Sequence, residues 1–177
     1  MGPMRRAPAF ARLRETLTGS FAASARGILG SDLVIHGREG EEIGRLRIFG
    51  PEGADLEVGD LEARIERSAP ARYTMLACGA TILSARPAGA LNTPEIWCLD
   101  RLYQGRLSLL RNAAEAGPAG DEVTIRITGG LTNRNYEATF DAGDEGSLPV
   151  AFFLLYLAVV LRRKAYLTAG LGSVDPT

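Results

Sequence analysis

The stretch Leu148–Leu161 reads LPVAFFLLYLAVVL and holds no charged or strongly polar side chain. A helix at a protein surface shows a single apolar stripe, whereas this one is apolar on every side, so protein or lipid must surround it. The segment has 14 residues, and at about 1.5 Å each they span about 21 Å, against about 30 Å for a bilayer core. The sequence therefore predicts a helix enclosed by the rest of its own chain.

Charged residues flank this segment on both sides. The acidic Asp141, Asp144 and Glu145 precede it, Ser147 stands at its start, and the basic run 162–164 follows it. Carboxylates at a helix N-terminus and cations at a C-terminus complement the helix dipole, and a serine can cap the first turn. We prefer this interpretation for both groups. The alternatives are a calcium site in the acidic turn, built from hard oxygen ligands, and a membrane-surface patch in the basic run.

Short strands separated by turns make up the middle of the chain. In the hairpin at 32–49, for example, Leu46 and Ile48 alternate with Arg45 and Arg47, which gives one buried and one exposed face. Such patterns predict about 9–12 strands, and a sheet of that size removes its edges by closing. A closed sheet has room for a helix. The predicted fold is α+β and mostly β: a closed antiparallel barrel around a buried C-terminal helix, with a short N-terminal helix.

Three regions are predicted along the chain. Residues 1–30 form an N-terminal extension with a short amphipathic helix at Phe10–Leu17. Residues 31–167 form the barrel with its central helix at 147–167, and 168–177 form a flexible tail. The segment Asn112–Gly120 (NAAEAGPAG) reads as a flexible loop inside the barrel region.

The composition excludes several classes of protein. A net charge of −1 argues against general attraction to nucleic acid. Lys164 is the only lysine, which is typical of a GC-rich bacterial genome and leaves no Walker-type nucleotide motif. His36 is the only histidine, and the two cysteines lack the histidine neighbours of a usual zinc site. With no catalytic motif visible, we expect neither an enzyme nor a cofactor.

The N-terminus carries charges without an apolar run behind them, so it does not read as a secretory signal. We therefore expect a cytoplasmic protein, peripheral to the membrane if it binds lipid. Cys78 and Cys98 are then expected to be reduced thiols in the core.

Arginines on outward strand faces are the candidates for binding lipid phosphates. The four are Arg45, Arg47, Arg64 and Arg126. If adjacent, they could meet an anionic headgroup, whereas the interleaved Glu62 and Glu66 favour a mixed, solvated surface.

Two passages resemble the tubby C-terminal-like superfamily, which includes tubby proteins, phospholipid scramblases and the plant LURP-one-related proteins. Asp32–Leu46 (DLVIHGREGEEIGRL) is similar to the strand–Gly–strand opening of that superfamily. Tyr136–Phe152 (YEATFDAGDEGSLPVAF) is similar to the passage in which an acidic turn leads into the apolar helix. The resemblance covers residues 32–167 and implies a barrel around a central helix.

The chain also departs from the branches of that superfamily. The acidic turn lacks the Asp spacing of the scramblase calcium segment, no lysine cluster suggests the tubby phosphoinositide site, and no cysteine-rich palmitoylation tract is present. The resemblance implies a non-enzymatic domain that binds a lipid headgroup, a membrane surface or a protein partner. The alternatives are a single-pass protein anchored by Leu148–Leu161, and a small-ligand carrier or hydrolase that uses the barrel mouth.

Overall fold

The structure, a computed structural model, describes residues 8–27, 31–132 and 134–171, and the side chains of all of these except 91 and 165–171. Its helices are α1 (Pro8–Leu17), the short 3-10 helix η1 (Gly50–Glu52) and α2 (Ser147–Leu171). Its strands are β1 (Ser20–Arg26), β2 (Asp32–His36), β3 (Glu42–Ile48), β4 (Gly53–Val58), β5 (Leu61–Ala69), β6 (Arg72–Ala77), β7 (Ala80–Ala88), β8 (Ala90–Cys98), β9 (Arg101–Ser108), β10 (Ala113–Pro118), β11 (Ile125–Gly129) and β12 (Asn135–Thr139).

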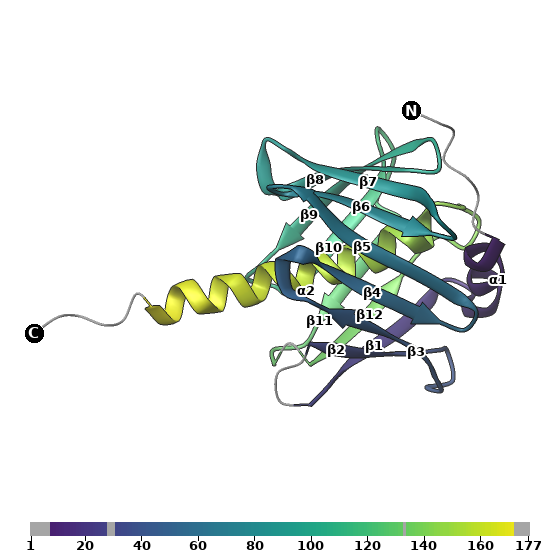
Figure 1. Ribbon diagram of the computed structural model, residues 1–177, viewed down its shortest axis with the longest axis horizontal. Helices are drawn as coiled ribbons and strands as arrows, with labels where there is room; N and C mark the ends of the chain where they lie inside the picture. The colour runs from purple at the N-terminus through teal and green to yellow at the C-terminus, as the bar shows by residue number, and fades with distance from the viewer. Residues whose placement is uncertain (1–7, 28–30, 133, 172–177) are drawn as a thin grey trace, which may run out of the picture.

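The twelve strands form a closed antiparallel barrel in which each strand pairs with its neighbours in sequence, and β1 pairs with β12 to close the ring. The helix α2 follows β12 and runs through the barrel, and its C-terminal part projects from the left end in Figure 1. The predicted fold, a mostly β closed barrel of 9–12 strands with a C-terminal helix and a short N-terminal helix, is confirmed.

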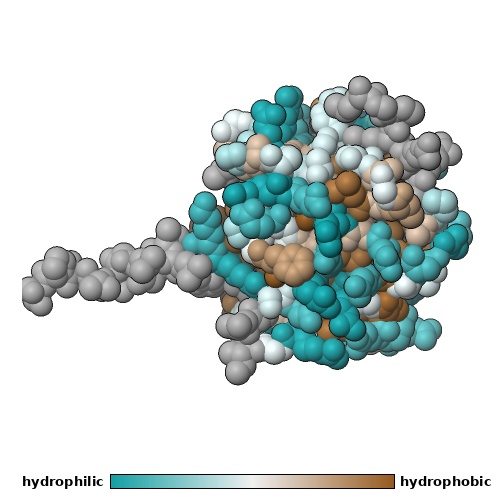
Figure 2. Space-filling model, viewed as in Figure 1, coloured by the Kyte–Doolittle hydropathy of each residue, from teal (hydrophilic) through white to brown (hydrophobic). Residues whose placement is uncertain are grey.

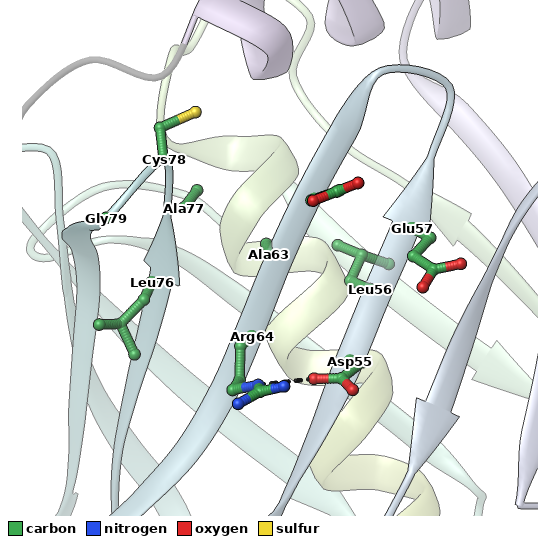
Figure 3. A pocket seen from close by; sticks show the side chains of 10 residues that line it. Asp55, Leu56, Glu57, Ala63, Arg64, Leu76, Ala77, Cys78 and Gly79 are labelled. Atoms are coloured by element: carbon green, nitrogen blue, oxygen red, sulfur yellow. Dashed lines mark hydrogen bonds and ion pairs between the residues drawn. The ribbon is translucent and has the colours of Figure 1, made fainter.

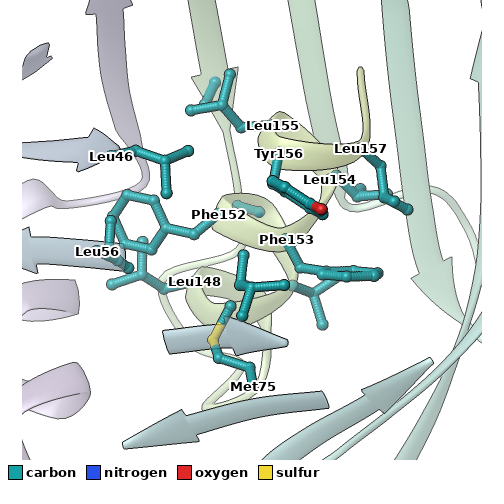
Figure 4. Close-up of a cluster of buried hydrophobic side chains, with 14 of the residues drawn as sticks. Leu46, Leu56, Met75, Leu148, Phe152, Phe153, Leu154, Leu155, Tyr156 and Leu157 are labelled. Atoms are coloured by element: carbon teal, nitrogen blue, oxygen red, sulfur yellow. The ribbon is translucent and has the colours of Figure 1, made fainter. Parts of the chain in front are cut away.

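The apolar segment of α2 is the core of the molecule. Every apolar side chain from Leu148 to Val160 is buried. Figure 4 shows the larger ones between Leu148 and Leu157 radiating from the helix toward side chains of the strands. Phe152 stacks on Phe21 of β1 with ring centroids 4.7 Å apart. The barrel thus provides the apolar surroundings that the sequence demands. Within the described part of the chain, no helix is long and apolar enough to cross a bilayer.

Three predicted boundaries were wrong. Ser20–Arg26, assigned to the N-terminal extension, is strand β1, and most of the predicted loop at 112–120 is strand β10. Both strands consist mainly of alanine, with serine in β1 and glycine in β10, and they hold no β-branched residue and one aromatic residue, Phe21. The residues that usually signal a strand are therefore almost absent from them. Their inward alanines, such as Ala23 and Ala116, are buried in the apolar core around the helix. The helix α2 also continues to Leu171, beyond the predicted end at 167, while 172–177 lie outside the described residues.

The two cysteines differ in their surroundings. Cys98 is buried in the core as predicted, and burial raises its pKa far above the ordinary value. The prediction for Cys78 was wrong, because this thiol is exposed in the β6–β7 turn, where its backbone adopts a left-handed φ of 52°. A tight turn between paired strands needs such a conformation.

The up-and-down topology divides the turns between two ends of the barrel. We call one the α1 end: it holds α1 and the turns 37–41, 59–60, 78–79, 99–100, 119–124 and 140–146. We call the other the helix-exit end, because α2 leaves the barrel there between the turns 49–52, 70–71, 89, 109–112 and 130–134, the last described without residue 133. Gly27 and Ser31 lie at this end as well. Figure 1 shows α1 on the right and the emerging helix on the left.

Candidate functional site

The four candidate arginines do not form one cluster. Arg45 and Arg47 lie on β3, and Arg64 lies on β5, so only β4 separates them. Arg126 lies on β11, with β12, β1 and β2 between it and β3. The barrel wall therefore brings three of the four together and leaves the fourth apart.

Carboxylates stand between the three grouped arginines. In the strand register, Arg45 lies opposite Glu57, and both Arg47 and Arg64 lie opposite Asp55. The Nε of Arg64 donates to Oδ1 of Asp55 at 2.8 Å, as the dashed line in Figure 3 shows. This hydrogen bond, with the charge of the carboxylate, raises the pKa of Arg64. The group is a mixed-charge surface, and space-filling Figure 2 shows hydrophilic residues over much of the visible wall.

A hollow of about 320 Å³ lies on this wall, between β4, β5 and the β6–β7 turn (Figure 3). Its charged lining consists of Asp55, Glu57, Glu62 and Arg64. Three carboxylates against one guanidinium, itself paired, disfavour the binding of a phosphate in this hollow.

Arg126 has a similar environment on the other side of the barrel. Glu115 of β10 lies opposite both Arg126 and Arg106, so one carboxylate stands between two guanidinium groups. A second hollow, of about 490 Å³, is lined by Arg106, Glu115, Gln104 and Asp121 among others. Its lining holds two carboxylates and one guanidinium, so neither hollow concentrates cations.

The acidic turn before α2 is largely occupied by contacts within the protein. Asp144 accepts a hydrogen bond from the hydroxyl of Tyr103, with both carboxylate oxygens within 2.8 Å, and Arg101 lies 3.5 Å from it. Asp141 accepts the backbone N–H of Gly143. Among the described residues, no group of three or more histidine, cysteine, aspartate and glutamate side chains is placed to hold a metal ion. Asp144 therefore anchors the start of α2.

His36 forms a hydroxyl–imidazole pair with Ser24, which pattern analysis of the sequence missed. The Ser24 Oγ lies 2.8 Å from Nε2 of His36, and the carbonyl of Gly40 lies 3.3 Å from Nδ1. Since the carbonyl can only accept, Nδ1 donates to it, and Nε2 shares a hydrogen bond with the serine hydroxyl. The group that orients the ring is a backbone carbonyl and not a carboxylate, and neither residue lines the two hollows described above.

The basic run 162–164 does not end the helix, because α2 continues to Leu171. The interpretation of these cations as partners of a helix C-terminus was therefore wrong, since the dipole acts within the last turn. Arg162 is instead buried, and its guanidinium donates to the carbonyl of Leu109 at 3.5 Å and to that of Leu131 at 3.4 Å. Burial lowers the pKa of Arg163, and Lys164 is exposed.

The two ends of the barrel carry opposite charge. In the turns of the α1 end, one arginine, Arg38, stands among nine carboxylates, and α1 adds Arg12, Arg14 and Glu15. The nine are Glu39, Glu41, Asp60, Asp100, Asp121, Glu122, Asp141, Asp144 and Glu145. At the helix-exit end, the described turns and the adjoining helix contain five cations and one carboxylate. They are Arg111, Arg134, Arg162, Arg163, Lys164 and Glu52.

Two exposed arginines of the helix-exit end, Arg111 and Arg134, have no acidic partner among the described residues. The carboxylate of this end, Glu52, is held by Arg67 of β5 at 3.0 Å. Arg111 and Arg134 are exposed on the 109–112 and 130–134 turns, and neither forms an ion pair with another residue of the described structure. The net charge of −1 thus conceals an axial separation of charge, which makes the helix-exit end the strongest candidate for contact with an anion.

Comparisons with known proteins agree with the fold. No family model matches the chain, and no curated protein matches it in sequence. The X-ray structure of a LURP-one-related protein from Arabidopsis thaliana is similar to it, with a TM-score of 0.57 and 11% identity over 90% of this chain and 97% of that chain. At this identity the similarity shows the fold alone.

Proposed function

We propose that this chain is a non-enzymatic member of the tubby C-terminal-like superfamily that binds an anionic membrane surface through its helix-exit end. The observation that carries the proposal is the concentration of cations at that end, opposite an acidic α1 end. A molecule with such an axial dipole approaches a negative surface with its basic end first, whatever its net charge. The protein would then be cytoplasmic and peripheral to the membrane.

The cations have the right positions for this role. Arg111 and Arg134 stand on neighbouring hairpin turns, and the carbonyls of these two turns accept hydrogen bonds from Arg162. A basic residue close to an anionic bilayer contributes about 1 kcal/mol of binding free energy. A few such residues give measurable binding, and screening shortens their range from about 10 Å at 0.1 M salt to about 3 Å at 1 M.

Sedimentation with vesicles tests the proposal. Vesicles of phosphatidylcholine with 30% phosphatidylserine should bind the protein at low salt, while pure phosphatidylcholine should bind it far less. The double variant Arg111→Gln/Arg134→Gln should weaken binding about thirtyfold, because two contacts of about 1 kcal/mol are lost. Melting temperatures of both proteins verify that the fold persists.

The matched control is Arg45→Gln/Arg47→Gln, which removes the same charge from the wall of β3. This variant should bind nearly as well as the original protein, since carboxylates already compensate these arginines in the strand register. Loss of binding in the control alone would move the site to the β3 wall. No binding to any anionic vesicle at low salt would rule out the lipid proposal and leave a protein partner.

A further inference from the structure

Large apolar side chains are exposed mainly at one end of the molecule. Among the described residues, six are prominent, and four of them lie at the helix-exit end: Phe49, Leu109, Leu110 and Leu131. Leu110 is 99% exposed and Leu131 is 92% exposed, far more than the other four. These two leucines occupy the tips of the turns 109–112 and 130–134, which are adjacent because β10 and β11 pair between them.

Polar contacts hold the backbones of both turns in place. Nδ2 of the buried Asn112 donates to the carbonyl of Gly130 at 2.8 Å, and the N–H of Gly129 donates to the carbonyl of Asn112 at 2.7 Å. Arg162 of α2 donates to a carbonyl in each turn. The turns are therefore tied to each other and to the central helix. Apolar tips on an ordered framework lose little conformational entropy when they become buried.

We propose that Leu110 and Leu131 are paired anchors that insert into the outer acyl layer of an anionic bilayer, while Arg111 and Arg134 remain at the phosphate level. This inference rests on the proposed function and adds the depth and orientation of the contact. Each of the two turns carries one exposed leucine and one exposed arginine, which matches the layered chemistry of the interface, with hydrocarbon below anionic headgroups. The barrel would stand on its helix-exit end, with the acidic α1 end facing away from the membrane.

A protein partner fits these tips less well than a bilayer. Stable protein interfaces bury about 1,600 Å² and rely on clustered aromatic and arginine residues, with leucine under-represented among the dominant contacts. Two leucine tips, on turns that also carry an exposed arginine each, form no such continuous patch. Two copies of this end would also bring like charges together, which opposes self-association through the same surface.

Removal of the two leucines should separate insertion from electrostatic attraction. Leu110→Ser/Leu131→Ser should lower binding to vesicles with 30% phosphatidylserine by about a hundredfold, because full burial of each leucine favours binding by about tenfold or more. The residual binding should vanish at 0.5 M salt, while the original protein should retain part of its binding. The matched control Trp97→Ser/Val123→Ser removes two exposed apolar side chains from the wall and the α1 end, and should leave binding unchanged.

Tryptophan fluorescence reports the depth directly. In a Trp97→Phe background, Leu110→Trp and Leu131→Trp should shift to the blue on vesicles and be quenched by lipids brominated on the acyl chain. Val123→Trp, at the opposite end, should show neither effect. Vesicle binding without quenching at 110 and 131 would overturn the anchor proposal and leave the proposed function standing. Quenching at 123 would reverse the orientation and overturn both.

Two further outcomes count against the anchors. If no variant binds anionic vesicles, the proposed function fails and the anchors fail with it. If sedimentation velocity shows that the original protein self-associates without lipid and that Leu110→Ser/Leu131→Ser is monomeric, the tips form an interface between copies. A monomer in both cases, with the hundredfold loss on vesicles, supports the anchors.

Discussion

The hydroxyl of Tyr103 on β9 donates to the carboxylate of Asp144 in the turn before α2, and both carboxylate oxygens lie 2.7–2.8 Å from it. The same carboxylate accepts the backbone N–H of Gly146 at 3.1 Å. Tyr103 is fully buried, so the contact joins the barrel wall to the start of the central helix inside the protein. It fixes the point at which the helix enters the barrel.

We expect Tyr103→Phe to destabilise the fold by about 2 kcal/mol, since a hydrogen bond to a buried carboxylate contributes about 1.5–3 kcal/mol. The melting temperature should fall by about 4–8 °C. Tyr156→Phe is the matched control, because the Tyr156 hydroxyl donates to the neutral carbonyl of Gly50 at 2.9 Å. The free energy of unfolding should fall by less in Tyr156→Phe, by about 1 kcal/mol. If thermal unfolding shows equal losses of stability in the two variants, the charge of Asp144 does not strengthen its hydrogen bond with Tyr103.

Alkaline pH should destabilise the protein through the same tyrosine. Burial and the nearby Asp144 raise the pKa of Tyr103 far above its ordinary value of 10.0. Above about pH 10 the unfolded chain releases this proton while the folded chain keeps it, so folding binds more protons and stability falls as pH rises. Burial raises the pKa of Tyr156 in the same direction. Denaturant titrations from pH 9 to 11 should show this loss, with a shallower slope in Tyr103→Phe.

Thiol labelling should distinguish the two cysteines. Cys78 is exposed, whereas Cys98 is buried and burial raises its pKa, so a reagent in solution reaches only Cys78 in the native protein. At pH 8 an aromatic disulfide reagent should therefore modify one thiol per chain quickly, and the second only when the protein unfolds. Cys78→Ser should abolish the fast phase. Two fast thiols in the native protein would contradict the buried position of Cys98.

The helix was predictable because LPVAFFLLYLAVVL demands apolar surroundings from every side, and strands with clear alternation, such as β3, indicated the barrel. The strands β1 and β10 were not predicted, because their small residues show no clear alternation of apolar and polar side chains. The consequence extends beyond their own residues, since consecutive hairpin turns alternate between the two ends of the barrel. If β10 is taken as a loop, the later turns are assigned to the wrong ends of the barrel. The turns that bear Leu110 and Leu131 are then predicted at opposite ends, although in the structure they lie at the same end.

The surroundings of the candidate arginines could not be predicted from the sequence either. Alternation placed Arg45 and Arg64 on an outward face, as the structure does, but the carboxylates that oppose them come from the neighbouring β4. Register across strands is a tertiary property that a single strand does not encode. A charge count taken turn by turn could have revealed the basic end, provided that every strand was recognised.

The enclosed helix makes a final prediction about the fold itself. Leu155 is completely buried near the middle of the apolar segment, and Figure 4 shows its side chain within the core. Leu155→Asp should prevent folding, because an unpaired carboxylate buried there costs several kcal/mol out of a total stability of about 5–15 kcal/mol. Leu155→Ala should destabilise by about 2–5 kcal/mol through the cavity it leaves, and Leu155→Met, which conserves volume, by less than about 1.5 kcal/mol. Circular dichroism and thermal unfolding of the three variants measure this order. A Leu155→Asp protein with native circular dichroism and an unchanged melting temperature would mean that the barrel does not enclose α2.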